Sequence, residues 1–173
     1  MAPTVQVFGP ATIKIAILAG GSGALQELGF TQNGVFLTSQ TFTENVPGDE
    51  NGGDSGPPIE IQYMGEIYRV RLELTKWDAT VAEHLKARFR GATSGTPPTA
   101  GGLVFAGNGY FRLCCHYNAG GTSPVPSADN FPCATMIGEP IELNKGTKWS
   151  RLVLDFICYK HPTSGILRDT SYA

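Results

Sequence analysis

Residues 58–89 read PIEIQYMGEIYRVRLELTKWDATVAEHLKARF and contain the clearest structural signal in the chain. From residue 59 to residue 75, apolar and polar side chains alternate, as they do in strands with one face on a core and the other in water. Met64, Gly65 and Glu66 interrupt this alternation and supply the glycine that a tight turn needs. We therefore expect two antiparallel strands joined by a hairpin turn at residues 64–66.

The hydrophobic period changes after this strand pair. Asp78 can cap a helix, and the apolar residues that follow recur at intervals of three and four. These are Val81, Ala82, Leu85 and Phe89. Glu83 lies early in this segment and three basic residues lie late, which suits the helix dipole, and Gly91 can end the helix. The sequence thus predicts one α-helix at about residues 78–90.

The remainder of the chain alternates between short apolar strands and clusters rich in glycine and proline, with 22 Gly and 12 Pro in all. Alternation predicts strands at 12–18, 28–30, 34–43, 103–105, 110–117, 133–137, 140–143 and 149–159, with 4–8 either a separate strand or continuous with 12–18. Asn33-Gly34 is typical of a hairpin turn. Long loops are expected at 44–58, 92–102 and 118–132.

These patterns predict a mainly β protein, a small antiparallel β-barrel or β-sandwich with one flanking helix. A length of 173 residues fits a single domain, which we place at residues 1–160, followed by a C-terminal arm at 161–173.

The charge of the chain argues against direct binding to DNA or RNA. Only 16% of residues are charged, the formal net charge is -2 and the pI is about 5.9, so there is no excess of basic residues to neutralise phosphates. No apolar run is long enough to cross a membrane, and the first residues do not resemble a signal peptide. We expect a soluble protein that is made in the cytoplasm and has no membrane partner.

Two patterns suggest catalysis or calcium binding, and each fails a test. Gly53-Asp54-Ser55-Gly56-Pro57 resembles the nucleophile motif of chymotrypsin-like serine proteases, but in that family the histidine precedes the serine, and all three histidines of this chain follow Ser55. The acidic residues of 44–58 lack the alternating order and the closing glutamate of a calcium loop. The sequence predicts no enzymatic activity and no cofactor.

The cysteines are the remaining candidates for chemistry. Cys114 and Cys115 are adjacent on an expected strand, so their side chains should point to opposite faces and cannot both bind one metal ion. We expect buried thiols and no metal, with one of this pair facing outward. An outward cysteine could link subunits, and the residues available for an inter-subunit disulfide are Cys114, Cys115, Cys133 and Cys158.

Several motifs in the first half of the chain resemble those of phage tail tube proteins and related small virion proteins. They are a Gly-Pro-Ala-Thr strand at residues 9–12, a Leu-Gly-Phe-Thr-x-x-Gly-Val step at 28–35, a loop rich in Asp, Gly and Pro at 49–58, and a strand-turn-strand-helix unit with a Leu-Glu-Leu core at 72–74. The two long loops of the second half and the paired cysteines are not part of this pattern.

This resemblance implies a structural virion protein, made in the host cytoplasm, whose copies form hexameric rings that stack into the phage tail tube. The tube would conduct DNA during ejection without binding it specifically, and the subunit could contact sheath, terminator and baseplate proteins. The loop at 44–58 would contact the neighbouring ring, through Glu44, Asp49, Glu50, Asp54 and Pro57. Whether the tail is contractile stays open.

Two alternatives remain. The chain could be another neck, terminator or baseplate protein. It could also be a soluble β-sandwich that binds a ligand through Tyr63, Tyr68, Tyr110, Tyr117 or Trp149.

Overall fold

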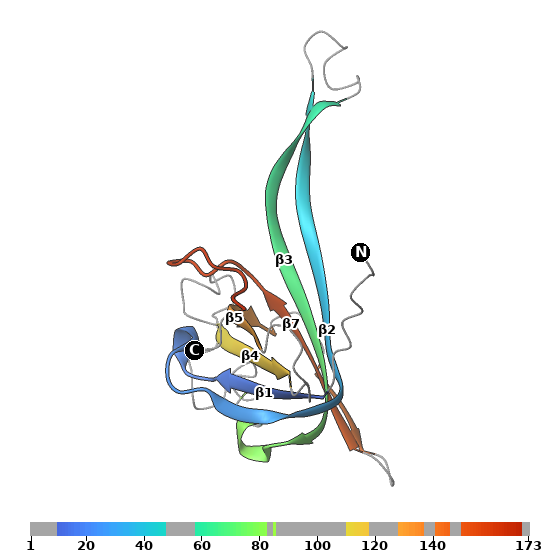
Figure 1. Cartoon of the computed structure of the whole chain (residues 1–173), viewed down its shortest axis with the longest axis vertical. Coiled ribbons are helices and arrows are strands. Elements are labelled where there is room, and N and C mark those ends of the chain that lie inside the picture. Colours follow the sequence, from blue (N-terminus) through green and yellow to red (C-terminus); the bar gives the residue numbers. More distant parts are fainter. Residues whose placement is uncertain are drawn as a thin grey trace, which may run out of the picture.

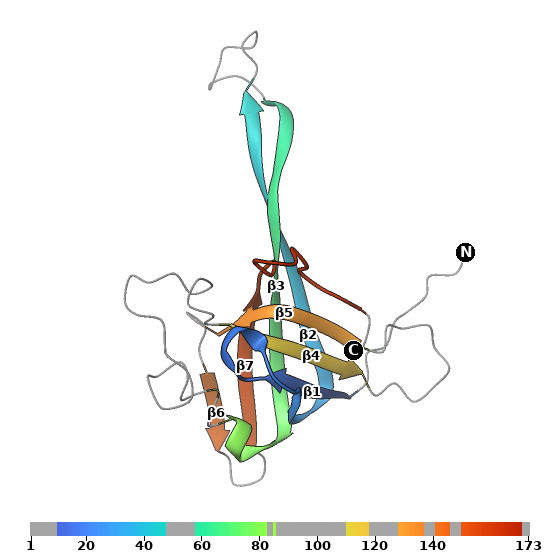
Figure 2. The ribbon, with the colours of Figure 1, turned by 90° about the vertical axis from the view of Figure 1, so that its left-hand side faces the viewer.

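The computed structural model describes residues 10–47, 58–82, 85, 110–117, 128–136, 141–145 and 150–170. In these residues seven antiparallel strands form one sheet in the order β3-β2-β1-β4-β5-β7-β6. They are β1 (Ala11–Ala16), β2 (Gln26–Pro47), β3 (Pro58–Trp77), β4 (Phe111–Tyr117), β5 (Ala128–Thr135), β6 (Ile141–Lys145) and β7 (Ser150–Cys158). Pairing of β3 with β7 closes six of the strands into a barrel, and β6 lies along the other edge of β7 (Figures 1 and 2). The prediction of a mainly β, antiparallel barrel is confirmed.

The interior of the barrel is filled by the apolar residues that the alternation placed on one face. Ile13 and Ile15 of β1 are fully buried, and so are Leu72 and Leu74 of β3. The inward residues of β7 complete the same cluster: Leu152, Leu154, Phe156 and Cys158. Burial of these side chains is the main favourable term that holds the strands together.

A helix begins where the sequence predicts it. The Val81 amide donates a hydrogen bond of 2.9 Å to the Asp78 side chain, which satisfies one of the open amides of the first turn. Val81, Ala82 and Leu85 are buried in the barrel core. The described residues contain little helix beyond this start and the short 3₁₀ turn η1 (Ala19–Gly21). The rest of the expected helix, including Phe89, lies outside them.

The predicted hairpin turn at residues 64–66 is wrong, because β3 runs through it as one continuous strand. Gly65 pairs with Phe42, and the next pair is Tyr63 with Thr43, so Met64 is an extra residue that forms a β-bulge. The positive φ of Gly65, 142°, serves this bulge rather than a turn.

The predicted turn at Asn33-Gly34 is wrong for the same reason. Thr31 pairs with Leu74 and Val35 pairs with Leu72, so residues 32–34 together lie opposite Glu73. Gly34 does have a positive φ, 82°, but it lies within β2. There β2 bends away from β1 and continues along β3 (Figure 1).

The ends of two predicted loops also prove to be strand. Residues 44–47 belong to β2 and Pro58 to β3, and Glu44 pairs with Gln62. Residues 128–132, expected in the third loop, form the first part of β5, where Phe131 is fully buried. The expected strands at 4–8 and 103–105, the loop at 92–102 and the tip at 48–57 lie outside the described residues.

The described part of the C-terminal arm folds back onto the barrel. Its backbone turns at residues 161–166, where the His161 amide donates to the Ile166 carbonyl. Asp169 then exchanges two backbone hydrogen bonds with Asn130, at 2.7 and 2.8 Å. This bridge places residues 168–170 against β5.

Candidate assembly surfaces

The β2–β3 hairpin extends well beyond the barrel as a two-stranded arm, formed by residues 40–47 and 58–67 (Figure 1). Pairing of β2 with β1 ends at Thr31, and pairing of β3 with β7 ends at Tyr68. Among the described strands, the two strands of the arm therefore pair only with each other. An isolated two-stranded hairpin is marginally stable in water, so this arm is an element that gains from a partner.

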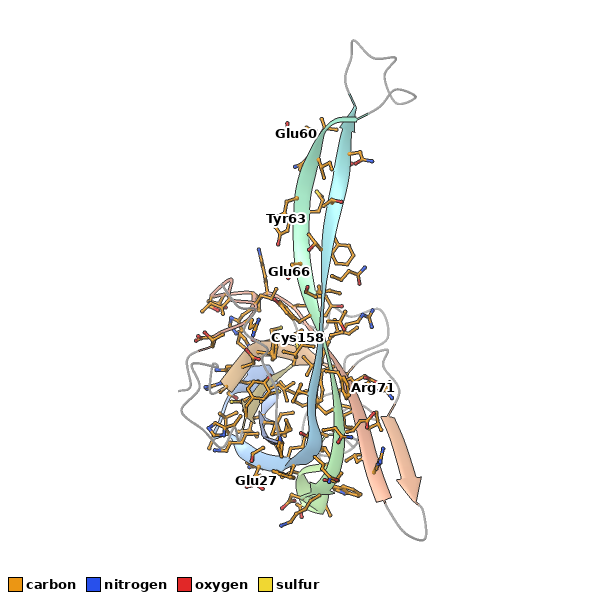
Figure 3. All side chains as sticks on the ribbon, turned by 45° about the vertical axis from the view of Figure 1, so that its right-hand side comes forward. Glu27, Glu60, Tyr63, Glu66, Arg71 and Cys158 are labelled. Atoms are coloured by element: carbon orange, nitrogen blue, oxygen red, sulfur yellow. The ribbon has the colours of Figure 1, made fainter. Side chains whose placement is uncertain are left out.

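Large apolar side chains of the arm are open to solvent. The exposed fractions are 43% for Phe42, 64% for Ile61, and 56% for both Tyr63 and Met64. Tyr63 projects from β3 well outside the barrel (Figure 3). Exposed apolar side chains that gather on one element typically mark an interaction surface.

The segment of the sequence that contains the arm, residues 40–67, is strongly acidic. Of the 15 Asp and Glu residues in the chain, six lie between residues 40 and 67, and all 13 Lys and Arg residues lie outside this range. The segment therefore carries a formal charge of -6, while nine acidic and 13 basic residues give the rest of the chain +4. The small net charge of -2 hides this separation.

A cationic surface lies on the outer side of the barrel where β2, β3 and β7 are neighbours. We call it the arginine face and define it by Phe36, Arg69, Arg71 and Arg151. Phe36 pairs directly with Arg71 across β2 and β3, which places both side chains on the same face. Phe36 is 51% exposed.

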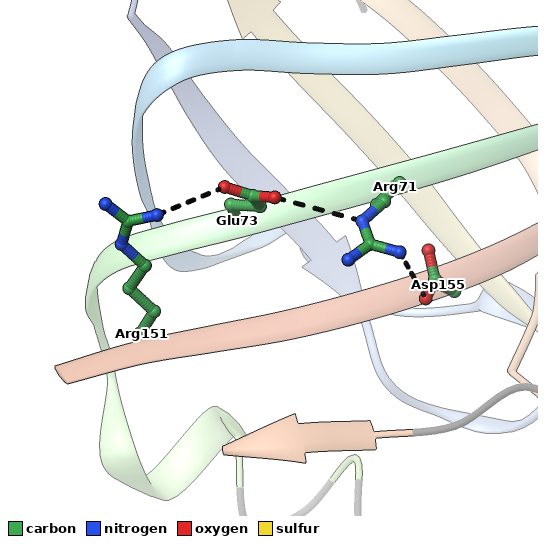
Figure 4. A network of polar contacts seen from close by, with 4 residues as sticks. All are labelled: Arg71, Glu73, Arg151 and Asp155. Atoms are coloured by element: carbon green, nitrogen blue, oxygen red, sulfur yellow. Dashed lines mark ion pairs between the residues drawn. The ribbon is translucent and has the colours of Figure 1, made fainter. Parts of the chain in front are cut away.

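Two carboxylates, those of Glu73 and Asp155, form ion pairs with Arg71 and Arg151 (Figure 4). Glu73 contacts Arg71 at 3.9 Å and Arg151 at 3.7 Å, and Asp155 contacts Arg71 at 3.8 Å. The side chains of Arg71 and Arg151 are 48% and 53% exposed, against 24% for Glu73 and 19% for Asp155. Such long, exposed ion pairs contribute little to stability, and the guanidinium groups stay accessible to a further anion.

A buried ionic cluster fastens the C-terminal segment to the barrel. Asp129 of β5 is 1% exposed, accepts a 2.7 Å hydrogen bond from the Tyr117 hydroxyl and pairs with Arg168 at 2.6 Å. The Arg168 guanidinium also lies 5.6 Å from the centre of the Tyr68 ring. Burial lowers the pKa of Arg168, but its hydrogen bond to Asp129 and the charge of that carboxylate raise it more. We assign this cluster a structural role.

All four cysteines are buried and free. Cys115 faces the core, and Cys114, on the opposite face of β4, is only 1% exposed. The prediction that one of this pair faces outward is therefore wrong. Burial raises the pKa of each thiol, to about 11 for Cys133. An inter-subunit disulfide stays a prediction, and each sulfur would first have to become accessible.

The tyrosines proposed for ligand binding do not share one surface. Tyr63 is exposed on the arm, Tyr110 and Tyr117 are 5% exposed, and Trp149 lies outside the described residues. A groove of about 340 Å³ follows β2 along Val35, Phe36, Leu37 and Thr38 and reaches Tyr117. The hydroxyl of Tyr117 already donates a hydrogen bond to Asp129, so its proton is not available to a ligand in this groove.

The predicted contact residues are only partly placed. Glu44 lies on the arm, in β2, and not in a loop. Asp49, Glu50, Asp54 and Pro57 lie outside the described residues, as does Ser55. Reasoning from the sequence missed the arginine face, because its residues come from strands that are distant in the chain. The uneven distribution of charge is visible in the sequence, because no Lys or Arg lies between residues 40 and 67. It indicates that the basic residues gather on the rest of the molecule.

Comparisons with protein-family models and with curated proteins find no match for this chain. In the part of the chain that the structure describes, no helix has the length and apolar character needed to cross a membrane. The same residues contain no group of three or more His, Cys, Asp or Glu side chains placed to hold a metal ion.

Proposed function

We propose that this protein is a structural subunit that assembles with copies of itself, and that the assembly is the tail tube of a phage. In this proposal copies form hexameric rings, the rings stack, and the hollow tube conducts DNA during ejection. The protein has no catalytic role. It is incorporated into the virion after synthesis in the host cytoplasm.

The observation that carries the proposal is the arm. It is long, two-stranded, rich in exposed apolar side chains and without a described partner strand beyond its own hairpin. A two-stranded hairpin is marginally stable alone, and a subunit can use such an extension to reach a neighbour.

The charge of the chain also fits a conduit. A lumen that lets DNA pass should not hold its phosphates, and a chain with a net charge of -2 has no overall basic excess. The same features suit a neck, terminator or baseplate subunit, which would form rings without long tubes. Sheath, terminator and baseplate proteins are the further partners that the proposal implies.

Negative-stain electron microscopy of the purified full chain at high concentration tests the proposal. Rings or tubes with a central hole are the expected result. Rings that never stack would favour the neck or terminator role. A protein that stays monomeric at every concentration would contradict self-assembly and favour the ligand-binding module.

A further inference from the structure

One face of the ribbon formed by β2 and β3 carries opposite charges at its two ends. Phe36 faces Arg71 at the barrel, and Phe42, Glu44 and Val46 follow on the same side of β2, since side chains two residues apart share a face. Glu60 of β3 joins them, because it pairs with Val46. One face of the β2–β3 ribbon is thus cationic beside the barrel and anionic on the arm.

The arm cannot balance its own charge. Glu44 and Glu60 are both exposed and are diagonal neighbours on this face, so their like charges repel each other. No Lys or Arg lies between residues 40 and 67. The cations that would relieve this repulsion must come from outside the arm.

We propose that the acidic face of the arm, formed by Phe42, Glu44 and Glu60, docks on the arginine face of a second copy of this chain. The inference rests on the proposed function and names the two surfaces that join. Charge complementarity between the exposed carboxylates of Glu44 and Glu60 and the exposed guanidinium groups of Arg71 and Arg151 points to another copy as the occupant. Each surface also presents an exposed aromatic ring, Phe42 on the arm and Phe36 on the barrel.

The contact joins two different surfaces, so it propagates. Each copy bound through its arm still presents its own arginine face, and such head-to-tail contacts build rings or open stacks rather than closed pairs. The arm strand of residues 40–47 spans about 26 Å at about 3.3 Å per residue, enough to lie across several strands of a neighbour. Arginine and aromatic residues are the types that commonly dominate interface energies.

Charge reversal on each side tests this pairing. The arm variant is E44K/E60K and the barrel variant is R71E/R151E. E27K and K160E are single-substitution controls, one for each direction of charge change, because Glu27 and Lys160 are exposed and lie outside both faces. The assay is sedimentation of the full chain at increasing protein concentration, with thermal unfolding to show that each variant is folded. Should R71E/R151E fail to fold, R71Q/R151Q replaces it as the barrel variant in the separate assays, and R151E replaces it in the mixture.

We expect each reversal alone to raise the concentration needed for assembly by about tenfold or more, while the controls behave as the parent chain does. An equal mixture of the arm variant and the barrel variant should assemble again, since each reversed arm then meets a reversed barrel. Raising NaCl from about 0.1 M to about 1 M shortens the Debye length from about 10 Å to about 3 Å and should weaken assembly of the parent chain.

Failure of this inference is distinguishable from failure of the proposed function. If the parent chain assembles and the reversed variants assemble equally well, the charge pairing is overturned while self-assembly stands. The same holds if the folded variants fail separately and also fail when mixed. If the parent chain never assembles, both are overturned.

Discussion

At the scale of single residues, Asp129 is a charged side chain that is almost completely buried. It lies on β5 and is only 1% exposed, and a carboxylate removed from water is costly unless it is paired. Arg168, 39 residues further along, supplies the charge, and Tyr117 supplies a hydrogen bond. The pKa of Tyr117 is raised mainly by burial, and further by the charge of Cys115 and the hydrogen bond to Asp129. Its hydroxyl therefore keeps its proton.

Replacing Arg168 with Met should destabilise the barrel by about 3 kcal/mol, because it leaves a buried carboxylate without its counter-charge. Urea unfolding measures this change. The double variant D129N/R168M removes the charge as well and should recover much of the loss. Equal midpoints for R168M and the parent chain would contradict the assigned role of the cluster.

The buried thiols predict a loss of stability at alkaline pH. Below about pH 9 the Cys133 thiol is protonated in both states and contributes no pH dependence. Above it the unfolded chain releases the proton while the folded chain holds it, up to a pKa of about 11. The free energy of unfolding should therefore fall with rising pH, by up to about 1.4 kcal/mol per pH unit for this thiol.

Urea unfolding at several values between about pH 8 and about pH 10.5 measures this slope. C133A lacks the thiol and serves as the comparison. Its absolute stability is lower, but its stability should fall less steeply with pH than that of the parent chain. Identical slopes would show that Cys133 titrates normally in the folded protein.

At the scale of elements, the arm and the barrel should differ in local stability. The barrel strands share a core, whereas residues 40–47 and 58–67 pair only with each other in the described chain. Backbone amides of the arm should exchange with solvent rapidly in the monomer and slowly in the assembled state, while those of β4 are protected in both. Hydrogen exchange with mass spectrometry measures the exchange rates of the arm and of β4 in the monomer and in the assembled state. Equal exchange of the arm in both states would mean that assembly does not involve it.

The sequence allowed the core to be predicted more reliably than the turns. Alternation placed Ile13, Ile15, Leu72 and Leu74 on the inner face, because one buried side requires a period of two. The sequence favours a turn at Gly34 because it follows Asn33, and at Gly65 because it lies in a short break between two alternating segments. Both have the positive φ expected, but a glycine in this conformation serves a bulge as well as a turn. Only the pairing of β2 with β3 along their whole length decides between them.

The candidate surfaces could be predicted only in part. Glu44 was included as a contact residue because of its acidic neighbours, and it lies on the arm. The arginine face combines residues 36, 69, 71 and 151, which register between β2, β3 and β7 brings together. Local pattern reading does not supply that register. The ion pair of Arg168 with Asp129 could not be predicted from local patterns either, because Asp129 lies on β5, 39 residues earlier in the chain.

At the scale of the whole molecule, the chain combines a closed barrel with an open-ended extension. Closing the barrel through β3 and β7 removes most free strand edges, which otherwise invite uncontrolled association. In the proposed assembly the arm is the element that joins neighbours, and its charge would make that contact selective. This combination suits a subunit that must stay separate during synthesis and then join neighbours in a fixed direction.

Shortening the arm tests this account most directly. Gln40 and Ile67 are directly opposite each other, so residues 41–66 can be replaced by Asn-Gly, which closes a two-residue hairpin. Sedimentation velocity then compares the shortened and full chains at equal concentration. We predict that the full chain forms large assemblies, while the shortened chain keeps its barrel, with a similar melting temperature, and stays monomeric. Equal assembly by a folded, shortened chain would contradict the central claim that the arm joins one copy to the next.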